Sequence, residues 1–435
     1  MTPSIGTATV TPRPVATRRS GYKWELLALF WCAYFLNQGD RQVFNAVLPL
    51  IKADLQATDV QLGLVATGFT LIYGVLVPVA GFLGDRFSQK WIVVASLLTF
   101  SVGTVLTGLS GGLLGLLFFR SLATGAGESF YYPAANALIG QHHRNTRAQA
   151  MAVHQSALYV GTIVSSLAAG YIGQRHGWRA AFYTFGVLGI GIAALMALRL
   201  RNERPVVRGV SDGEVAEPPA KMREVLGVVL RKPTLYCLSV AFGAMVFVNV
   251  GFMTWMPTFL YEKFHLSLKD AAFQSVFLHL VFAFLGVMIG GRVSDRLAGR
   301  RPTIRLEMEW LGLLLGAPFI FLLGRSNALG VVYVALAGFG LFRGIYDSNL
   351  IAALFDVIPP RYRSSATGLM LAFAFVVGAA APVILGYIKQ HADLGQGLSA
   401  LAFVYLFGAA VLFAAMKLTF PRDFLGVAPT EAPAL

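Results

Sequence analysis

Charge is scarce in this chain, and cysteine is scarcer still. Only 13% of the 435 residues are Asp, Glu, Lys or Arg, whereas soluble domains carry about a quarter. Cys32 and Cys237 both lie in apolar runs, so neither a disulfide framework nor a cysteine metal site is indicated. Neither a phosphate-binding glycine loop nor a GxSxG nucleophile motif is present. We therefore expect no enzyme activity, no metal and no cofactor.

Long apolar runs take the place of charge. Hydrophobic residues make up 56% of the sequence, and twelve runs are close to the roughly 20 residues that a helix needs to cross a bilayer. Six runs lie on each side of a polar segment rich in Pro and charge. They predict an all-α membrane protein with twelve transmembrane helices. The predicted spans are residues 26–50, 61–83, 91–109, 113–139, 148–172, 180–198, 234–260, 271–293, 306–323, 329–357, 364–388 and 397–416.

These runs divide the chain into five parts. Residues 1–24 are predicted to form a disordered cytoplasmic tail, and residues 25–199 are predicted to form a six-helix bundle. Residues 200–233 are predicted to form a cytoplasmic linker. Residues 234–418 are predicted to form a second six-helix bundle, and residues 419–435 are predicted to form a second cytoplasmic tail.

The net charge of +14 is explained by membrane topology and not by nucleic-acid binding. With the N-terminus inside, 25 of the 35 Lys and Arg residues fall on the cytoplasmic side, 7 on the external side and 3 inside spans. Cytoplasmic loops of membrane proteins carry this excess. We expect both termini in the cytoplasm of a bacterium, a monomer in the inner membrane, the lipid bilayer as surroundings, and no nucleic-acid partner.

The two halves of the sequence repeat each other in parallel. Pro49 in the first span is matched by Pro257, 208 positions later, and Asp85 after the second span is matched by Asp295, 210 positions later. Parallel repeats predict two pseudo-symmetric bundles that face each other across a central cavity.

Charged residues inside the spans mark the expected site. An ionised side chain at bilayer depth costs about 2.5–3.5 kcal/mol on insertion scales, so it is expected to face a protein-lined cavity. We count three acids and three bases, a balance that suits a buried site. They are Asp40, Arg41, Arg120, Glu128, Arg343 and Asp347.

Arg41 is the candidate anchor for an anionic substrate. Its guanidinium stays protonated, and its planar fork matches a carboxylate or a phosphate. The alternative is an internal salt bridge with Asp40 or Glu128 that only holds helices together. Adjacent helix positions point about 100° apart, so Asp40 and Arg41 are expected to have different partners.

Glu128 is the first candidate for a proton carrier, and Asp40 is the second. A dry site favours the neutral acid and an approaching Arg favours the carboxylate, so proton affinity would change with the state of the bundles. The alternative is permanent pairing with Arg120, which lies eight residues away and about 12 Å along the helix axis. Arg120 and Asp347 complete the proton-coupling set.

Polar side chains in the spans are candidates for lining the cavity. Asn249 falls opposite Arg41 under the repeat, so one half would supply charge and the other neutral hydrogen bonds. The predicted substrate-binding residues are Arg41, Tyr73, Tyr132, Gln155, Asn249, Arg343, Tyr346 and Asn349.

GFLGDRFSQK at residues 81–90 resembles the signature of the major facilitator superfamily, and GRVSDRLAGRR at 291–301 resembles its second copy. The resemblance covers residues 24–418 and implies the fold of that family, with two pseudo-symmetric six-helix bundles. Ser88 and Gln89 depart from the pattern, which has Gly and a basic residue there.

The Asp of this motif is a candidate for gating. An Asp near a helix end can accept hydrogen bonds from backbone N–H groups or a nearby Arg and so latch one state of the bundles. The alternative is a turn whose charge only sets the membrane topology. The predicted gating residues are Asp85, Arg86, Asp295 and Arg296.

Two branches of the superfamily are similar at the charged residues. Asp40-Arg41 with Arg120 and Glu128 resembles the anion:cation symporters, which implies an Arg for the substrate and a Glu for the proton. The same residues, with Leu-Pro49 after Asp-Arg, also resemble the Spinster branch of lysolipid and sphingolipid transporters.

We therefore expect a secondary active transporter that works by alternating access. The proton gradient would drive symport of a small organic anion, such as a sugar acid or another carboxylate. The alternatives are a Spinster-like lysolipid carrier, a facilitator without ion coupling, and a membrane sensor that does not transport.

Overall fold

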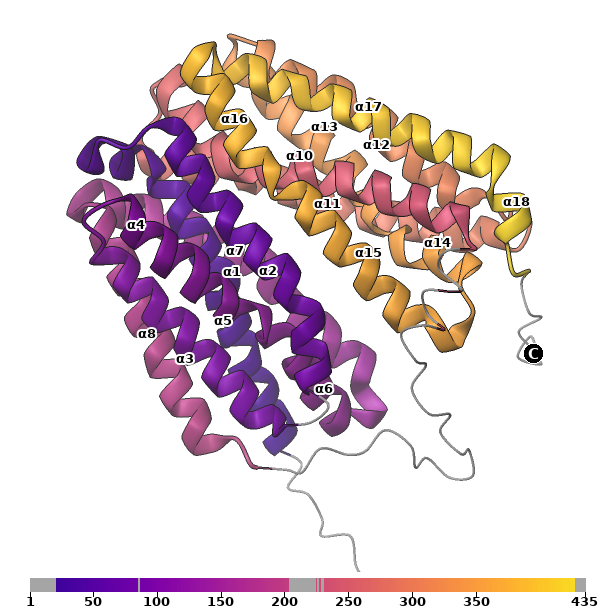
Figure 1. Cartoon of the computed structure of the whole chain (residues 1–435), viewed down its shortest axis with the longest axis horizontal. Helices are drawn as coiled ribbons and strands as arrows, with labels where there is room; N and C mark the ends of the chain where they lie inside the picture. Colours follow the sequence, from indigo (N-terminus) through magenta and orange to yellow (C-terminus); the bar gives the residue numbers. More distant parts are fainter. Residues whose placement is uncertain (1–20, 85–86, 203–223, 225–226, 228–230, 427–435) are drawn as a thin grey trace, which may run out of the picture.

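The computed structural model describes residues 21–84, 87–202, 224, 227 and 231–426, and every regular element in this part of the chain is helical (Figure 1). Backbone groups have no water to bind in a bilayer, so apolar runs must satisfy them within helices. The helices form two bundles, coloured indigo to magenta and rose to yellow in Figure 1.

The first bundle runs from α1 to α8 and the second from α10 to α18. The first contains α1 (Tyr22–Leu55), α2 (Asp59–Gly84), α3 (Gln89–Gly108), α4 (Leu113–Gly115), η1 (Leu116–Thr124), α5 (Gly125–Ser129), α6 (Tyr131–His142), η2 (Arg144–Thr146), α7 (Arg147–His176) and α8 (Trp178–Arg199). The second contains α10 (Pro233–Phe264), α11 (Leu268–Ala298), α12 (Ile304–Arg325), α13 (Leu329–Asp347), α14 (Leu350–Val357), η3 (Pro360–Tyr362), α15 (Arg363–Gly378), α16 (Ala380–His391), α17 (Leu394–Leu418) and α18 (Phe420–Asp423).

Ten helical stretches among the described residues are long and apolar enough to cross a membrane. The other two predicted spans are helical as well. α1 has 34 residues, and its polar segment from Asn37 to Gln42 lowers its mean hydropathy. The span at 113–139 is divided into α4, η1, α5 and α6. Together these elements form the predicted architecture of twelve spans in two bundles.

The fourth span is irregular where Arg120 lies. Leu116–Thr124 (η1) is a π-helix, and α-helical geometry resumes in α5, which carries Glu128. The Ser121 hydroxyl donates to the Val65 carbonyl over 2.7 Å and fixes η1 against α2. π-Helical turns are rare and occur mostly at functional sites. The irregularity changes the angular register between Arg120 and the residues of α5.

The bundles contact each other along two sets of helices. α2 packs along α15 and α16, and α7 packs along α11. Glycine permits the approach, because a Cβ on Gly63 would lie 2.5 Å from the Pro382 carbonyl oxygen and one on Gly386 would lie 2.5 Å from that of Asp59. Small residues at such crossings let helix backbones pack closely in a membrane.

These contacts are concentrated towards one end of the molecule, which we call the Asp59 end, where α1 joins α2 and α16 joins α17. Along α2 they continue to Gly74, which lies against Phe375, about 22 Å from Asp59 along the axis. Towards the opposite end, α6 packs on α1, α2, α3 and α7, whereas α14 packs on α10, α12 and α15. The two bundles diverge in that direction in Figure 1.

Candidate functional site

Two buried ion pairs lie inside the first bundle. The Arg41 Nε donates to Glu128 Oε2 over 2.7 Å, and the Arg120 Nη1 donates to Asp40 Oδ2 over 2.7 Å. α1 supplies an acid and a base from adjacent positions, and the fourth span supplies their partners. The 100° turn between adjacent helix positions thus gives Asp40 and Arg41 different partners, as predicted. Glu128 pairs with Arg41 and not with Arg120.

The Asp40–Arg120 pair is saturated on the carboxylate side. The Thr104 hydroxyl donates to Asp40 Oδ1 over 2.6 Å, so both Asp40 oxygens are engaged. The side chains of Asp40 and Arg120 are only 3% and 4% exposed. Removing one partner of such a pair strands the other charge in the interior. This geometry fits a role in holding α1 to α3 and η1.

The Arg41–Glu128 pair is not saturated. The Arg41 side chain is 23% exposed, whereas that of Glu128 is fully buried. Arg41 Nη2 and Glu128 Oε1 are both buried, and neither has a hydrogen-bond partner among the residues that the structure describes. Buried polar atoms are normally bonded. The guanidinium can therefore accept an anion, and the carboxyl can accept a proton.

Two rings of α2 lie against the guanidinium groups. Arg41 Cζ lies 4.3 Å from the Tyr73 ring centroid and 5.5 Å from that of Phe69. Arg120 Cζ lies 4.4 Å from the same Phe69 centroid. Cation–π contacts of this kind use the face of the ring. They hold both guanidinium groups while leaving N–H groups for other acceptors.

The charged residues of the second bundle are arranged differently. Arg343 Nη1 lies 2.9 Å from His279 Nε2, and Arg343 Nε lies 3.4 Å from Asp347 Oδ2. Because an arginine N–H donates to it, His279 Nε2 is an acceptor and the imidazole is neutral. His279 is fully buried against Phe252 and Phe339, with ring centroids 5.0 and 4.6 Å away.

Predicted lining residues gather near Arg41. Tyr73 contacts it directly, and the Tyr132 hydroxyl donates to Gln155 Oε1 over 3.3 Å. Tyr34, which the sequence analysis missed, connects them: its ring centroid lies 5.5 Å from that of Tyr132, and it lies within electrostatic reach of Arg41 and Tyr73. Tyr34 is seven residues before Arg41, two helical turns away on the same face. This spacing is the feature of the sequence from which Tyr34 could have been predicted.

Three other predicted lining residues lie on the second bundle. Asn249 of α10 is half-buried, and its Oδ1 has no hydrogen-bond partner within the described residues. Tyr346 and Asn349 are fully buried, and the Asn349 Nδ2 donates to the Ile345 carbonyl over 3.1 Å. Asn349 stands between α13 and α14, so its Nδ2 bonds at the helix junction, whereas its buried Oδ1 has no hydrogen-bond partner within the described residues.

Two of the four predicted gating residues lie in the part of the chain that the structure describes. Asp85 and Arg86 lie outside the described residues. Asp295 and Arg296, near the end of α11, are exposed, and neither belongs to an ion pair among the residues that are described.

An ion-pair cluster at the Asp59 end does link the bundles, and the sequence analysis did not identify it. Asp59 accepts from Lys52 of α1 over 2.7 Å and from Lys389 of α16 over 3.0 Å. Lys389 also donates to Glu262 of α10 over 2.8 Å. The side chains of Asp59 and Lys389 are each 8% exposed. No spacing rule pairs residues 330 positions apart, so Lys52 and Lys389 were counted only as external loop charges.

Our count of six charged residues inside the spans was too low. Arg292 falls within the predicted span 271–293 and Asp356 within 329–357, and Glu307 and Glu309 both fall within 306–323. Glu307 lies near its edge and accepts from the Thr303 hydroxyl over 2.6 Å. Glu309 is fully buried, and neither of its carboxyl oxygens has a hydrogen-bond partner in the described part of the chain. Burial without a partner favours the neutral acid.

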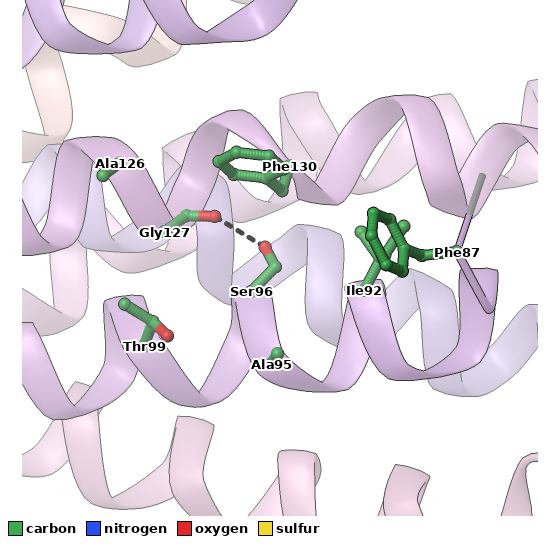
Figure 2. A pocket seen from close by; sticks show the side chains of 8 residues that line it. All are labelled: Phe87, Ile92, Ala95, Ser96, Thr99, Ala126, Gly127 and Phe130. Atoms are coloured by element: carbon green, nitrogen blue, oxygen red, sulfur yellow. Dashed lines mark hydrogen bonds between the residues drawn. The ribbon is translucent and has the colours of Figure 1, made fainter. Parts of the chain in front are cut away.

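An apolar pocket of about 280 Å³ lies beside α5 (Figure 2). The Ser96 hydroxyl in its wall donates to the Gly127 carbonyl over 2.6 Å, so this polar group is already bonded. The lining residues are Phe87, Ile92, Ala95, Ser96, Thr99, Ala126, Gly127 and Phe130. None of them is charged, so this lining offers no cation to an anionic ligand.

Residues 30–382 match the family model of the Major Facilitator Superfamily. The chain belongs to this superfamily. It is 27% identical to a probable sulfoacetate transporter of Cupriavidus necator over 384 residues, which cover 84% of this chain and 87% of that protein. It is 25% identical to the hexuronate transporter of Bacillus subtilis over 426 residues, covering 94% and 97%. It is 27% identical to protein spinster of Drosophila melanogaster, covering 89% of this chain but 65% of that longer protein.

The superfamily fold is also seen in solved structures. Crystal structures of a bacterial homologue of the human lysosomal transporter Spinster, inward-facing and either unoccupied or occupied, give TM-scores of 0.83 and 0.81. Each match covers 94% of this chain and all of the solved chain, at 21% and 22% identity. The predicted family, fold and general function are confirmed. The protein is an integral membrane transporter of the major facilitator superfamily.

Proposed function

We propose that this transporter is a proton-coupled symporter for a small organic anion, in which Arg41 binds the anion and Glu128 carries the proton. One observation carries the proposal: the ion pair joins a partly exposed Arg41 to a fully buried Glu128, and each keeps a buried polar atom without a partner in the described residues. The relatives named for sulfoacetate and hexuronate support an anionic substrate.

Competition for Arg41 couples the two ligands. An anion that binds the guanidinium fork withdraws it from Glu128, whose side chain is fully buried. A buried carboxyl group without a cation is stable only when it is protonated. Protonation of Glu128 in turn releases Arg41 for the anion. Each ligand therefore favours binding of the other, as reciprocal coupling requires.

Asp40 and Arg120 support this exchange without taking part in it. Both oxygens of Asp40 already accept hydrogen bonds, one from Arg120 and one from Thr104. Its pairing with Arg120 keeps α1 in place while Arg41 changes partner. Arg343 and Asp347 provide the polar centre on the second bundle, where Arg343 contacts the substrate in the closed state.

Alternating access follows from the places where the bundles touch. We place the Asp59 end outside and both termini in the cytoplasm of a bacterium, because Lys and Arg are concentrated in the loops on the terminal side. The described state is then open to the cytoplasm, and the cluster of Asp59 and Lys389 closes its external end. Opening of that end requires this cluster to separate. In this mechanism a monomer in the inner membrane carries out transport, and the proton gradient is its only driving force.

A lysolipid carrier is the second candidate. The similarity to Drosophila spinster and the apolar pocket between α3 and α5 (Figure 2) favour it. In that function Arg41 would bind the phosphate, and the acyl chain would need an apolar path between helices.

Transport by the purified full-length protein in proteoliposomes tests the proposal. A pH gradient, acidic outside, is imposed, and uptake of labelled glucuronate, sulfoacetate, benzoate and lysophosphatidate is measured with and without a protonophore. We expect uptake of a small anion that the gradient accelerates and the protonophore abolishes. Uptake of lysophosphatidate alone would support the carrier instead. Uptake that does not depend on the gradient would indicate a facilitator. Tight binding without flux would indicate a sensor.

A further inference from the structure

We propose that the anion bound by Arg41 is a planar aromatic carboxylate and not a sugar acid. This inference rests on the proposed function, since it concerns the same anion site. It is drawn from the two rings that lie against Arg41 and from the rings of both bundles that continue from them.

Rings of the first bundle lie beside Arg41 and along α1 from it. Phe69 and Tyr73 are nearly parallel, at 11°, with centroids 6.5 Å apart, and Arg41 lies over both. Tyr34 stands two turns before Arg41 on α1, about 10.5 Å along the axis, with Tyr132 packed against it. Tyr132 is 38% exposed, so this wall is accessible. A ligand that extends from Arg41 along α1 meets ring surface.

Rings of the second bundle complete the wall. The Tyr73 ring meets Phe375 of α15 edge-to-face, with centroids 5.2 Å apart. The Tyr159 ring of α7 meets Phe284 of α11 in the same way at 6.0 Å. Both contacts cross from one bundle to the other. A substrate ring placed between these two contacts would be enclosed when the bundles close.

This lining suits a flat apolar body better than a polyhydroxylated one. Offset and edge-to-face ring pairs add to affinity by a factor of about 2 to 10 beyond the area that they bury. A sugar acid carries hydroxyl groups on most of its carbons, and hydroxyls pressed against ring faces lose water without gaining an acceptor. The phenol groups of Tyr34, Tyr73, Tyr132 and Tyr159 can serve one or two polar ring substituents.

Binding to the full-length protein in detergent, measured by titration calorimetry, tests the inference. Benzoate, cyclohexanecarboxylate and glucuronate share a carboxylate and a six-membered ring, so they differ in planarity and hydroxylation. We expect benzoate to bind about 2- to 10-fold more tightly than cyclohexanecarboxylate, and glucuronate to bind most weakly. Tyr73→Leu should remove most of the preference for benzoate over cyclohexanecarboxylate, and Tyr73→Phe should keep it. The ratio is the readout, because Tyr73 also touches Arg41.

The outcomes separate the two levels of the proposal. Glucuronate binding more tightly than benzoate, in a manner that needs Arg41, would overturn the aromatic preference and leave the anion site in place. An unchanged ratio in Tyr73→Leu would also overturn the preference. Binding of all three acids that survives Arg41→Ala would overturn the proposed function itself.

Discussion

The polar centres of the two bundles differ although the bundles repeat each other. In the first, two arginines each bind a buried carboxylate, and of these two carboxylates Glu128 alone keeps an oxygen without a hydrogen-bond partner in the described residues. In the second, Arg343 donates to the neutral His279 at 2.9 Å and is 3.4 Å from Asp347. Pseudo-symmetry therefore reproduces the helices but not the chemistry. In the mechanism that we propose, the exchange of anion and proton takes place in the first bundle, where a carboxylate competes directly with the substrate for a guanidinium.

We expect the largest effect from a substitution that lowers the stability of the polar centre in the first bundle. Arg120→Met leaves Asp40 as an unpaired buried charge, so we expect a loss of about 3–5 kcal/mol in unfolding free energy. Chemical unfolding in detergent measures it. The double variant Asp40→Leu with Arg120→Met should recover most of the loss, because no charge is then stranded. A loss below about 1 kcal/mol in the single variant would show that Asp40 is not held as an ion.

Arg41→Lys should weaken binding of an anionic substrate by about 10- to 100-fold. The substitution keeps the charge but removes the planar fork that binds two carboxylate oxygens. Titration calorimetry on the purified variant measures this change. Arg343→Lys, at the arginine of the second bundle's polar centre, serves as the comparison and should have a smaller effect. Equal losses at the two positions would contradict the assignment of the anion to the first centre.

Arg343→Met tests the second centre by stability. It leaves His279 with an unbonded buried acceptor and takes the cation from Asp347, whose side chain is 30% exposed and so keeps part of its hydration; we expect a loss of about 1–2 kcal/mol. Unfolding under the same conditions as for Arg120→Met gives the comparison. A loss as large as that of Arg120→Met would show that the two centres are electrostatically equivalent.

Asp59→Asn tests whether the cluster at the Asp59 end stabilises the closed external side. Loss of the charge weakens the contacts to Lys52 and Lys389, and we expect a shift of about 1 kcal/mol towards opening, or about fivefold in population. Distances between spin labels on α2 and α16 report it. Asp59→Glu keeps the charge and is the control. Unchanged distance distributions in Asp59→Asn would show that backbone packing alone closes this end.

Glu309→Gln should have the smallest effect. Glu309 has no cation beside it in the described residues, so a neutral amide replaces a neutral acid, and we expect a change within about 1 kcal/mol. Thermal unfolding and gradient-driven uptake are the measurements. A loss of gradient-driven uptake with stability unchanged would place a second proton site in the second bundle.

The sequence predicts the helices of this protein better than the pairing of its side chains. Hydropathy and the repeat identify twelve spans and two bundles, because bilayer thickness dictates the length of each run. Helix periodicity also predicts that Asp40 and Arg41 have different partners. It does not predict that Glu128 binds Arg41, since that depends on how α5 packs against α1 beyond the π-helix.

Other parts of the site escape sequence reasoning for separate reasons. The contact between Asp59 and Lys389 joins positions 330 residues apart, and each looks like an ordinary loop charge. The bond from Asn349 Nδ2 to the Ile345 carbonyl depends on the break between α13 and α14, which a continuous apolar run does not show. Glu309 was visible within its span and simply went uncounted.

Glu128→Gln tests the central claim most directly, through a comparison of two kinds of transport in the same proteoliposomes. One is uptake driven by a pH gradient, and the other is exchange of labelled for unlabelled substrate without a gradient. If Glu128 carries the proton that competes for Arg41, the variant should lose gradient-driven uptake and retain exchange. Gradient-driven uptake that remains at the wild-type rate would contradict the account.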